Sequence, residues 1–183
     1  MAGSDEELML EYAGGDAAAF EALYRKHKGP LFRFVLRSVK SRGEAEELFQ
    51  DVWARVIEAR ARYAPQAKFS TWLYTIAHNR LVDHWRARGL TVVPLETEDE
   101  APIEVPAGPA AEPHRRAEAR QTVSRLLDAL AALPAAQREA FLLHEESGLS
   151  VAEIAAATGT GEETAKSRLR YAMSKLREAI EDD

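Results

Sequence analysis

The chain has 183 residues and a formal net charge of −6, which allows one medium-sized domain or two small ones. It contains no cysteine, so disulfides and cysteine-based zinc sites are excluded, and a cytoplasmic location is expected. No apolar run approaches the ~20 residues that cross a bilayer, and the acidic start MAGSDEELML lacks the order of a signal peptide, so no membrane insertion is expected.

Residues 1–88 are expected to form a bundle of helices. Asp16 can cap the segment AAAFEALYRKH, and Pro30 suits the first turn of a separate helix, LFRFVLRSVK. Gly43 precedes EAEELFQDVWARVIEARARY, whose apolar residues recur at helical spacing. Ser70 is expected to cap STWLYTIAHNRLVDHWRAR, after a break at YAPQAK. No stretch shows the alternation of a strand, so the expected fold class is all-α.

Residues 89–113 read as a connector between two helical domains. This segment contains six acids, five prolines and no basic residue. Proline at this density prevents helices and sheet ladders, and charges of one sign favour an extended chain. The segment is therefore expected to be a flexible acidic linker between a domain at 1–88 and a domain at 114–183.

The second domain is expected to hold two helices that end at Pro134 and Gly148, followed by a helix-turn-helix. Two capping boxes mark the last pair of helices, with a glycine between them: Ser150 with Glu153, Thr160 with Glu163, and Gly159. This spacing leaves about two turns of helix, a tight turn and a longer helix. It is typical of DNA-binding proteins in which the second helix enters the major groove.

The longer helix has a basic side. Thr164 to Arg177 contains five basic residues and no acid. On a helical wheel the apolar residues, with Ile180, share one face, and a polar strip bordered by cations lies opposite. Such a face suits DNA, because the cations reach the phosphates while the strip meets base edges. The expected contacts are Glu163, Thr164, Lys166, Ser167, Arg168, Arg170, Tyr171 and Ser174. A solvated cationic face without a partner is the alternative.

Aromatic residues gather around the break in the first domain. Tyr63, Phe69, Trp72 and Tyr74 surround a loop that contains Pro65, and the polar residues Asn79, Arg80, Arg86 and Arg88 follow. Rings interleaved with cations and amides suit unpaired bases, which stack on them. Taken alone, however, this segment is better explained by core packing.

Four motifs in order make the chain resemble a bacterial RNA polymerase sigma factor of the extracytoplasmic-function (ECF) type, in the sigma-70 family. GDAAAFEALYRKHKGPLFRF resembles the start of region 2, and EAEELFQDVWARV its signature for binding core polymerase. KFSTWLYTIAHNRLVDHWR resembles the melting and −10 recognition segment. LPAAQREAFLLHEESGLSVAEIAAATGTGEETAKSRLRYAMSKLRE resembles region 4, which reads the −35 element. The resemblance covers nearly the whole chain and implies that the two domains are sigma regions 2 and 4.

The resemblance also implies partners and contact residues. Docking on the β′ clamp helices of core polymerase would use Glu46, Glu47, Leu48, Gln50, Asp51, Val52 and Trp53. The loop Tyr63 to Lys68 matches the loop that holds a base flipped out of the −10 element. The implied −10 set is Tyr63, Ala64, Pro65, Gln66, Lys68, Phe69, Trp72, Asn79, Arg80 and Arg86. Region 4 would meet the β flap, and Lys166, Ser167 and Tyr171 match −35 contact positions.

One departure from the family concerns the helix expected to recognise the −35 element. The family often has arginine near the present Tyr171 and Met173, so phosphate contact and base preference are expected to differ here. The resemblance implies that the linker threads through the polymerase toward the RNA exit channel. Its six acids and lack of basic residues lead to the hypothesis that it mimics nucleic acid along a basic channel there.

The function expected is a promoter-specificity subunit that directs core RNA polymerase to specific −35/−10 promoters. By resemblance it would be stress-responsive, controlled by an anti-sigma factor, and a monomer when free. A self-sufficient repressor or activator with a helical sensor domain is the alternative. An enzyme is not supported: the five histidines contain no i,i+4 pair, and there is no phosphate-binding glycine loop. No catalytic residue, cofactor or metal is therefore expected.

Overall fold

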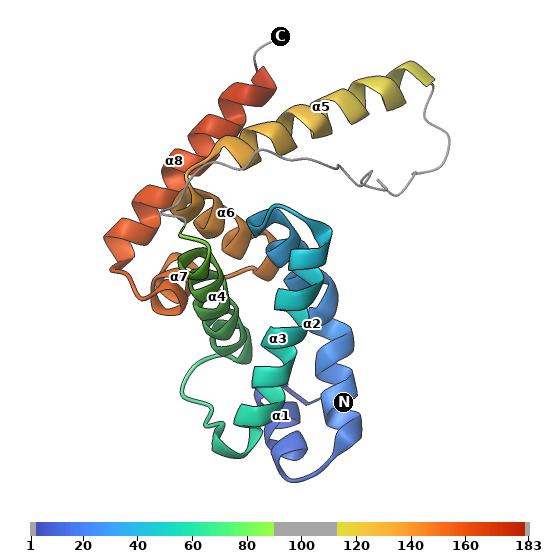
Figure 1. Ribbon diagram of the computed structural model, residues 1–183, viewed down its shortest axis with the longest axis vertical. Coiled ribbons are helices and arrows are strands. Elements are labelled where there is room, and N and C mark those ends of the chain that lie inside the picture. Colours follow the sequence, from blue (N-terminus) through green and yellow to red (C-terminus); the bar gives the residue numbers. More distant parts are fainter. Residues whose placement is uncertain (1–2, 90–112, 182–183) are drawn as a thin grey trace.

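The computed structural model describes residues 3–89 and 113–181, so the predicted linker lies, apart from its two end residues, outside the described residues. Within them the chain forms eight α-helices and one short 3-10 helix, with no strand (Figure 1). The first half contains α1 (Asp5–Ala13), α2 (Ala17–Ser38), α3 (Arg42–Ala59), the 3-10 helix η1 (Arg60–Arg62) and α4 (Phe69–Ala87). The second half contains α5 (Pro113–Ala132), α6 (Ala135–Ser147), α7 (Val151–Thr158) and α8 (Glu162–Glu181). The all-α prediction is confirmed.

Local signals fixed several helix ends as predicted. The Asp16 carboxylate accepts a hydrogen bond from the Ala18 N–H at 2.9 Å and so caps α2. The capping box of Ser150 with Glu153 starts α7. Gly148 and Gly159 end α6 and α7 in the left-handed region, at φ of 65° and 66°, where glycine has no steric penalty.

Tertiary packing overrode two local signals in the first half. Pro30 does not start a new helix but lies inside the continuous α2. It removes one helical hydrogen bond, yet Leu23 and Leu31 on either side are fully buried and hold the helix together. Helix α4 begins at Phe69, so the predicted capping residue Ser70 lies within the helix, and the N-cap residue Lys68 forms no side-chain cap.

Three further ends differ from the prediction. The Ser41 hydroxyl accepts from the Glu44 N–H at 3.3 Å, so α3 begins before Gly43. Helix α8 begins at Glu162, which leaves Thr160 outside the cap, with its hydroxyl 3.2 Å from that of Thr158. Helix α1 was not predicted, although the capping box formed by Ser4 and Glu7 marks its start.

The two halves pack against each other (Figure 1). Helix α2 lies against α6, α4 lies against α7, and the buried apolar residues of both halves form one continuous cluster. Polar contacts also cross this interface, among them the ion pairs of Arg33 with Glu146 at 2.7 Å and Lys68 with Glu153 at 2.8 Å, and a hydrogen bond between His78 and Glu139 at 2.6 Å. This arrangement was not predicted from the sequence, because it depends on contacts between residues far apart in the chain.

Helix α1 is joined to α2 by a partly buried polar contact. Asp5 accepts hydrogen bonds from Lys26 and His27, both at 2.8 Å. Burial acts to raise the pKa of Asp5, but the bonds from Lys26 and His27 outweigh it and hold the pKa below its usual value. Burial lowers the pKa of His27 although the bond to Asp5 opposes this shift. The neutral ring must then donate through Nε2–H, because an ionised carboxylate can only accept.

We expect acid to destabilise the fold through His27. In the unfolded chain this ring takes up a proton near its usual pKa of 6.5, whereas burial resists protonation in the folded protein. The unfolded state therefore binds more protons below that pH, and the free energy of unfolding falls as the pH drops. His27→Gln should remove up to about 1.4 kcal/mol per pH unit from this slope as the pH falls below about 6.5, measured by urea unfolding.

His144→Gln is the matched control, because that side chain is 42% exposed. Its slope should equal that of the wild type. A His27→Gln protein with the wild-type slope would contradict the prediction.

Candidate nucleic-acid and polymerase interfaces

Helix α8 is rotated so that its basic side faces outward. Its buried residues are Ala165, Leu169, Ala172 and Leu176, and it packs against α5, α6 and α7. They recur every three or four positions and therefore form one face, which leaves the opposite face in solvent. Tyr171 on that opposite face is 60% exposed. Ile180 was expected on the packed face but is 43% exposed, because it lies more than a turn beyond Leu176, the last buried residue of the helix.

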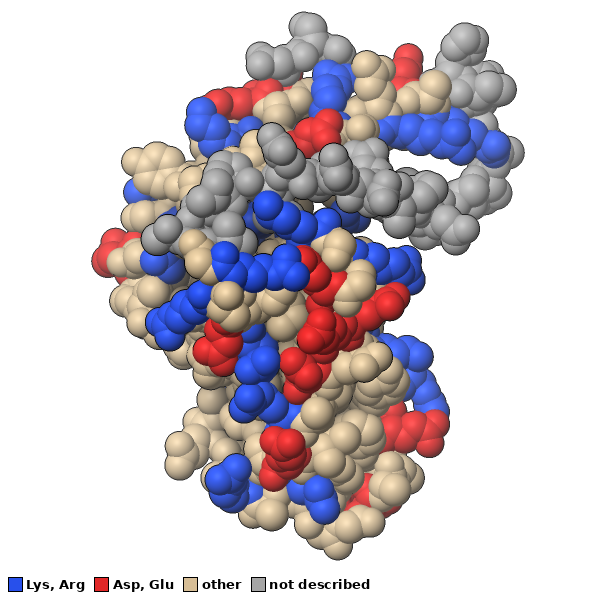
Figure 2. Space-filling view, in the orientation of Figure 1, with Lys and Arg blue, Asp and Glu red and all other residues tan. Residues whose placement is uncertain are grey.

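The residues predicted to contact the −35 element share this outward side. Glu163, Thr164, Lys166, Arg170, Tyr171 and Ser174 are exposed, and Ser167 and Arg168 are half-buried. In Figure 2, Lys and Arg side chains gather over the part of the molecule where α4, α7 and α8 lie. The structure thus presents these residues on a single helix face that carries no acid between Thr164 and Arg177.

The loop between η1 and α4 separates into a buried frame and an exposed tip. Tyr63, 8% exposed, packs its ring 5.0 Å from Trp72 and 6.4 Å from Phe69, which is fully buried. Burial, with smaller effects from Glu6 and Asp5, raises the pKa of Tyr63 to about 12. Residues 64–68 between these rings are all exposed. Core packing therefore accounts for Tyr63, Phe69 and the buried Tyr74, while the loop tip is available to a ligand.

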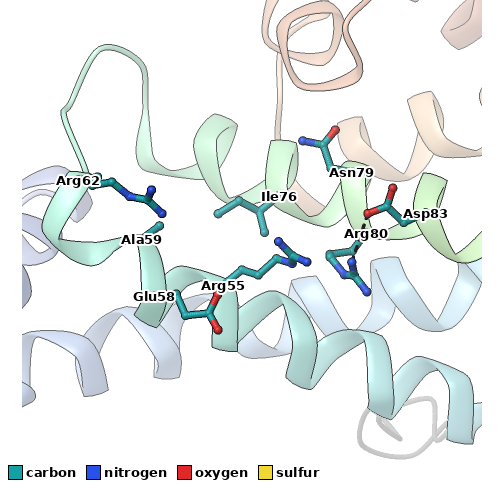
Figure 3. A pocket seen from close by; sticks show the side chains of 8 residues that line it. All are labelled: Arg55, Glu58, Ala59, Arg62, Ile76, Asn79, Arg80 and Asp83. Atoms are coloured by element: carbon teal, nitrogen blue, oxygen red, sulfur yellow. Dashed lines mark hydrogen bonds and ion pairs between the residues drawn. The ribbon is translucent and has the colours of Figure 1, made fainter.

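A pocket of about 210 Å³ lies between α3 and α4, beside this loop (Figure 3). Its lining residues are Arg55, Glu58, Ala59, Arg62, Ile76, Asn79, Arg80 and Asp83. In Figure 3, the apolar Ile76 lies between the guanidinium groups of Arg55 and Arg62. An apolar floor, an amide and flanking cations are the groups that hold an unpaired base and its phosphate.

Arg80 joins this pocket to the predicted polymerase-binding set. Its guanidinium donates to Asp51 on α3 at 3.1 Å and to Asp83 on its own helix at 3.2 Å. Two carboxylates thus pair with the terminal nitrogens of Arg80, whose side chain is 21% exposed, while its buried Nε has no hydrogen-bond partner among the described residues. Arg55 and Arg62 are exposed and form no ion pair with any residue that the structure describes. They are the cations of the pocket that are free to meet a phosphate.

The predicted polymerase-binding residues on α3 also separate by burial. Glu46, Glu47 and Gln50 are exposed and Asp51 is half-buried, whereas Leu48, Val52 and Trp53 are buried. Figure 2 shows acidic side chains gathered over the upper part of α3. The apolar members of the motif therefore fix the rotation of α3, and its polar members form the surface that a partner can reach.

Sequence reasoning missed Arg55, Glu58 and Arg62 of the pocket and Glu6 near the loop. Arg55 and Glu58 lie three residues apart near the end of α3, and Arg62 follows four residues later at the end of η1; this periodicity could have indicated them. Glu6 gives no such signal, because its contact is made with Phe69, 63 residues along the chain.

No helix in the described ranges is long and apolar enough to cross a membrane. Among the same residues, no cluster of three or more His, Asp or Glu side chains could hold a metal ion.

An outward-facing basic helix in a helix-turn-helix, a pocket suited to an unpaired base, and an acidic surface on a second helical unit define a two-part promoter-binding protein. Two family descriptions match the chain: Sigma-70 region 2 over residues 23–91 and Sigma-70, region 4 over residues 124–176. The chain belongs to the sigma-70 family of RNA polymerase sigma factors, as the relatives below also show.

The RNA polymerase sigma factor CarQ of Myxococcus xanthus is 33% identical over 172 residues, which cover 94% of this chain and 95% of that protein. The ECF RNA polymerase sigma factor RpoE of Cereibacter sphaeroides is 34% identical over 166 residues, or 89% of this chain and 87% of that protein. The solved structure of the sigma factor RpoE in complex with the anti-sigma factor NepR, from Bartonella quintana, matches with a TM-score of 0.71. Its identity is 25%, over 90% of this chain and 98% of that one. These relatives place the chain in the ECF group.

We expect Arg170→Ala to weaken promoter binding about equally for all −35 sequences. Arg170 is exposed on the outward side of α8, where we expect its guanidinium to meet a phosphate rather than a base. Losing one phosphate contact should reduce the slope of log affinity against log salt by ~0.9. The measurement is fluorescence anisotropy of holoenzyme on promoter DNA over a range of salt concentrations.

Arg25→Ala serves as the control, because Arg25 is exposed on α2 and pairs with Glu21 of the same helix. It should leave the salt slope unchanged. Equal slopes for the Arg170 variant and the wild type would place Arg170 outside the DNA contact.

Proposed function

We propose that this chain is the subunit that binds core RNA polymerase and directs transcription initiation at promoters with −35 and −10 elements, without catalytic activity of its own. The observation that carries the proposal is the outward basic face of α8, held in place by a buried stripe within a helix-turn-helix. A repressor would share that face, but the polymerase-binding motif on α3 favours a sigma factor. The site of action would be the cytoplasm, where the polymerase and its promoters are.

Residues 1–88 would act as region 2 and residues 114–183 as region 4. In region 2 the exposed loop tip at 64–68 would meet the −10 element. The pocket beside it, with Asn79, would hold a flipped base while Arg55 and Arg62 meet the backbone. Glu46, Glu47 and Gln50 would form the surface for the β′ clamp helices. In region 4 the outward side of α8 would read the −35 element, and the domain would meet the β flap.

The packed arrangement of the halves would have to open on a promoter. The end of the −10 loop touches the helix-turn-helix directly, because Lys68 lies 2.8 Å from Glu153 on α7. If the two promoter elements are about two DNA turns apart, their centres are ~70 Å apart. While the −10 loop and the helix-turn-helix touch each other, they cannot reach two elements that far apart. The halves would therefore separate when both elements are bound.

An anti-sigma factor is the regulator we infer. The RpoE protein of Bartonella quintana, similar over 90% of this chain, was solved in complex with the anti-sigma factor NepR. A partner of this kind would hold the chain away from polymerase until a stress signal releases it. When free, the chain would be a monomer.

Run-off transcription with purified core polymerase tests the function. A sigma factor should give specific initiation from promoters mapped after its overexpression, and core polymerase alone should not. A repressor or activator would shift promoter DNA without polymerase and would not restore initiation to core polymerase. That outcome would overturn the proposal.

Glu47→Lys should lower the affinity for core polymerase by about tenfold, because one favourable charge is replaced by a like charge at the interface. Glu47 is exposed on α3, so the substitution should leave the fold intact. Fluorescence-detected titration of core polymerase measures the affinity, and circular dichroism checks folding.

Glu11→Lys is the matched control, since it makes the same charge change at an exposed position on α1. Affinity should stay within about twofold of the wild type. A similar loss in both variants would indicate an effect of net charge rather than of the α3 surface.

A further inference from the structure

Helix α4, which follows the −10 loop, takes its N-terminal cap from another helix. The N-cap residue Lys68 has no side-chain cap bond. Instead the Phe69 N–H donates to the Glu6 carboxylate at 2.6 Å. The first N–H groups of a helix have no partner within it, and a carboxylate there also interacts favourably with the helix dipole. This bond is the largest cause of the lowered pKa of Glu6.

Glu6 is held firmly in its place. The preceding residue Asp5 binds Lys26 and His27 on α2, and Met9 of the same helix is fully buried. The His27 ring lies 5.1 Å from the Phe69 ring, so α1, α2 and the start of α4 meet at one point. These contacts hold the backbone of α1 in place and so keep the Glu6 side chain next to the start of α4.

The capped residue is also the anchor of the loop. The exposed residues 64–68 run between Tyr63 and Phe69, whose buried rings lie 6.4 Å apart. Ring packing holds the two side chains, and at the Phe69 end the backbone is held by the bond from the Phe69 N–H to Glu6, together with the bond from the Trp72 N–H to the Lys68 carbonyl at 3.1 Å. A shift of that backbone would change where the loop tip and the start of α4 lie.

We propose that Glu6 is a positioning residue for −10 recognition, which sets the conformation of the loop without touching DNA. The inference rests on the proposed function of this loop. Loss of the cap should weaken the preference for particular bases in the −10 element. The affinity for core polymerase through α3 and the base preference of α8 in the −35 element should not change.

The test uses holoenzyme made with the full chain and two template pools. One pool is randomised over the −10 element and the other over the −35 element of a promoter that the wild type uses. Sequencing of the transcribed templates gives the enrichment of the preferred bases. Glu6→Ala should reduce −10 enrichment by about fivefold, the loss of equilibrium preference expected from one cap. Glu6→Gln, which keeps an acceptor oxygen without the charge, should lie between Glu6→Ala and the wild type.

Glu11→Ala removes an exposed carboxylate from the same helix and should match the wild type in both pools. Hydrogen exchange at the Phe69 amide should be faster in Glu6→Ala, which checks the loss of the bond directly. Unchanged −10 enrichment together with faster exchange would overturn the proposal. So would a parallel loss in both pools or in core affinity, which would show a general structural role.

The two hypotheses fail differently. If wild-type holoenzyme shows no preference in either pool, the proposed function fails. If the wild type discriminates and Glu6→Ala discriminates equally well, only the role of Glu6 fails.

Discussion

The packing of α4 against α7 is the contact on which the arrangement of the molecule depends. It brings the helix that follows the −10 loop against the first helix of the helix-turn-helix and, with α2 on α6, merges the two halves into one apolar cluster. Two of the ion pairs at this interface involve well-exposed cations, Lys68 at 71% and Arg33 at 56%, and contribute little. The hydrogen bond between His78 and Glu139 is shielded, with side chains 16% and 5% exposed. The interface is therefore stabilised mainly by apolar burial, and opening would return His78 and Glu139 to water.

The charged side chains are not spread evenly over the surface, and basic and acidic residues lie on different helices. The chain carries a net charge of −6, yet the outward side of α8 is basic, while the exposed residues Glu46 and Glu47 give the upper part of α3 an acidic surface. A basic face suits DNA phosphates, and an acidic face suits a protein partner of opposite charge. Arg80, which binds Asp51 on α3 and lies beside Asn79 on α4, physically connects the two surfaces of region 2.

Sequence alone predicted what depends on near neighbours in the chain. The cap at Asp16, the capping box at Ser150 and the glycine ends of α6 and α7 are local, and each formed as expected. The buried stripe of α8 followed from its spacing, so the direction of its basic side could be predicted as well. The start of α4 could not, because its cap comes from Glu6, far away in the sequence.

Which residues of a motif are buried could not be predicted from the sequence either. The motif on α3 and the aromatic loop each mix residues that hold the helices together with residues that can meet a partner. Trp53 and Glu47 look equally probable as contacts until packing shows that one is buried and the other exposed. Pro30 shows the same limit for secondary structure, since the buried leucines on either side keep α2 continuous.

Single-molecule Förster resonance energy transfer between two dyes tests the central claim. The claim is that the two halves, which pack together in the free protein, separate when the protein is bound to a promoter. The absence of cysteine allows specific labelling at Ala18→Cys on α2 and Ala156→Cys on α7, two exposed positions outside the proposed contacts. The free protein should show one high-transfer state. In a transcribing complex with core polymerase and promoter, the transfer should fall to the low value expected for elements ~70 Å apart. High transfer that persists in an actively initiating complex would contradict the account.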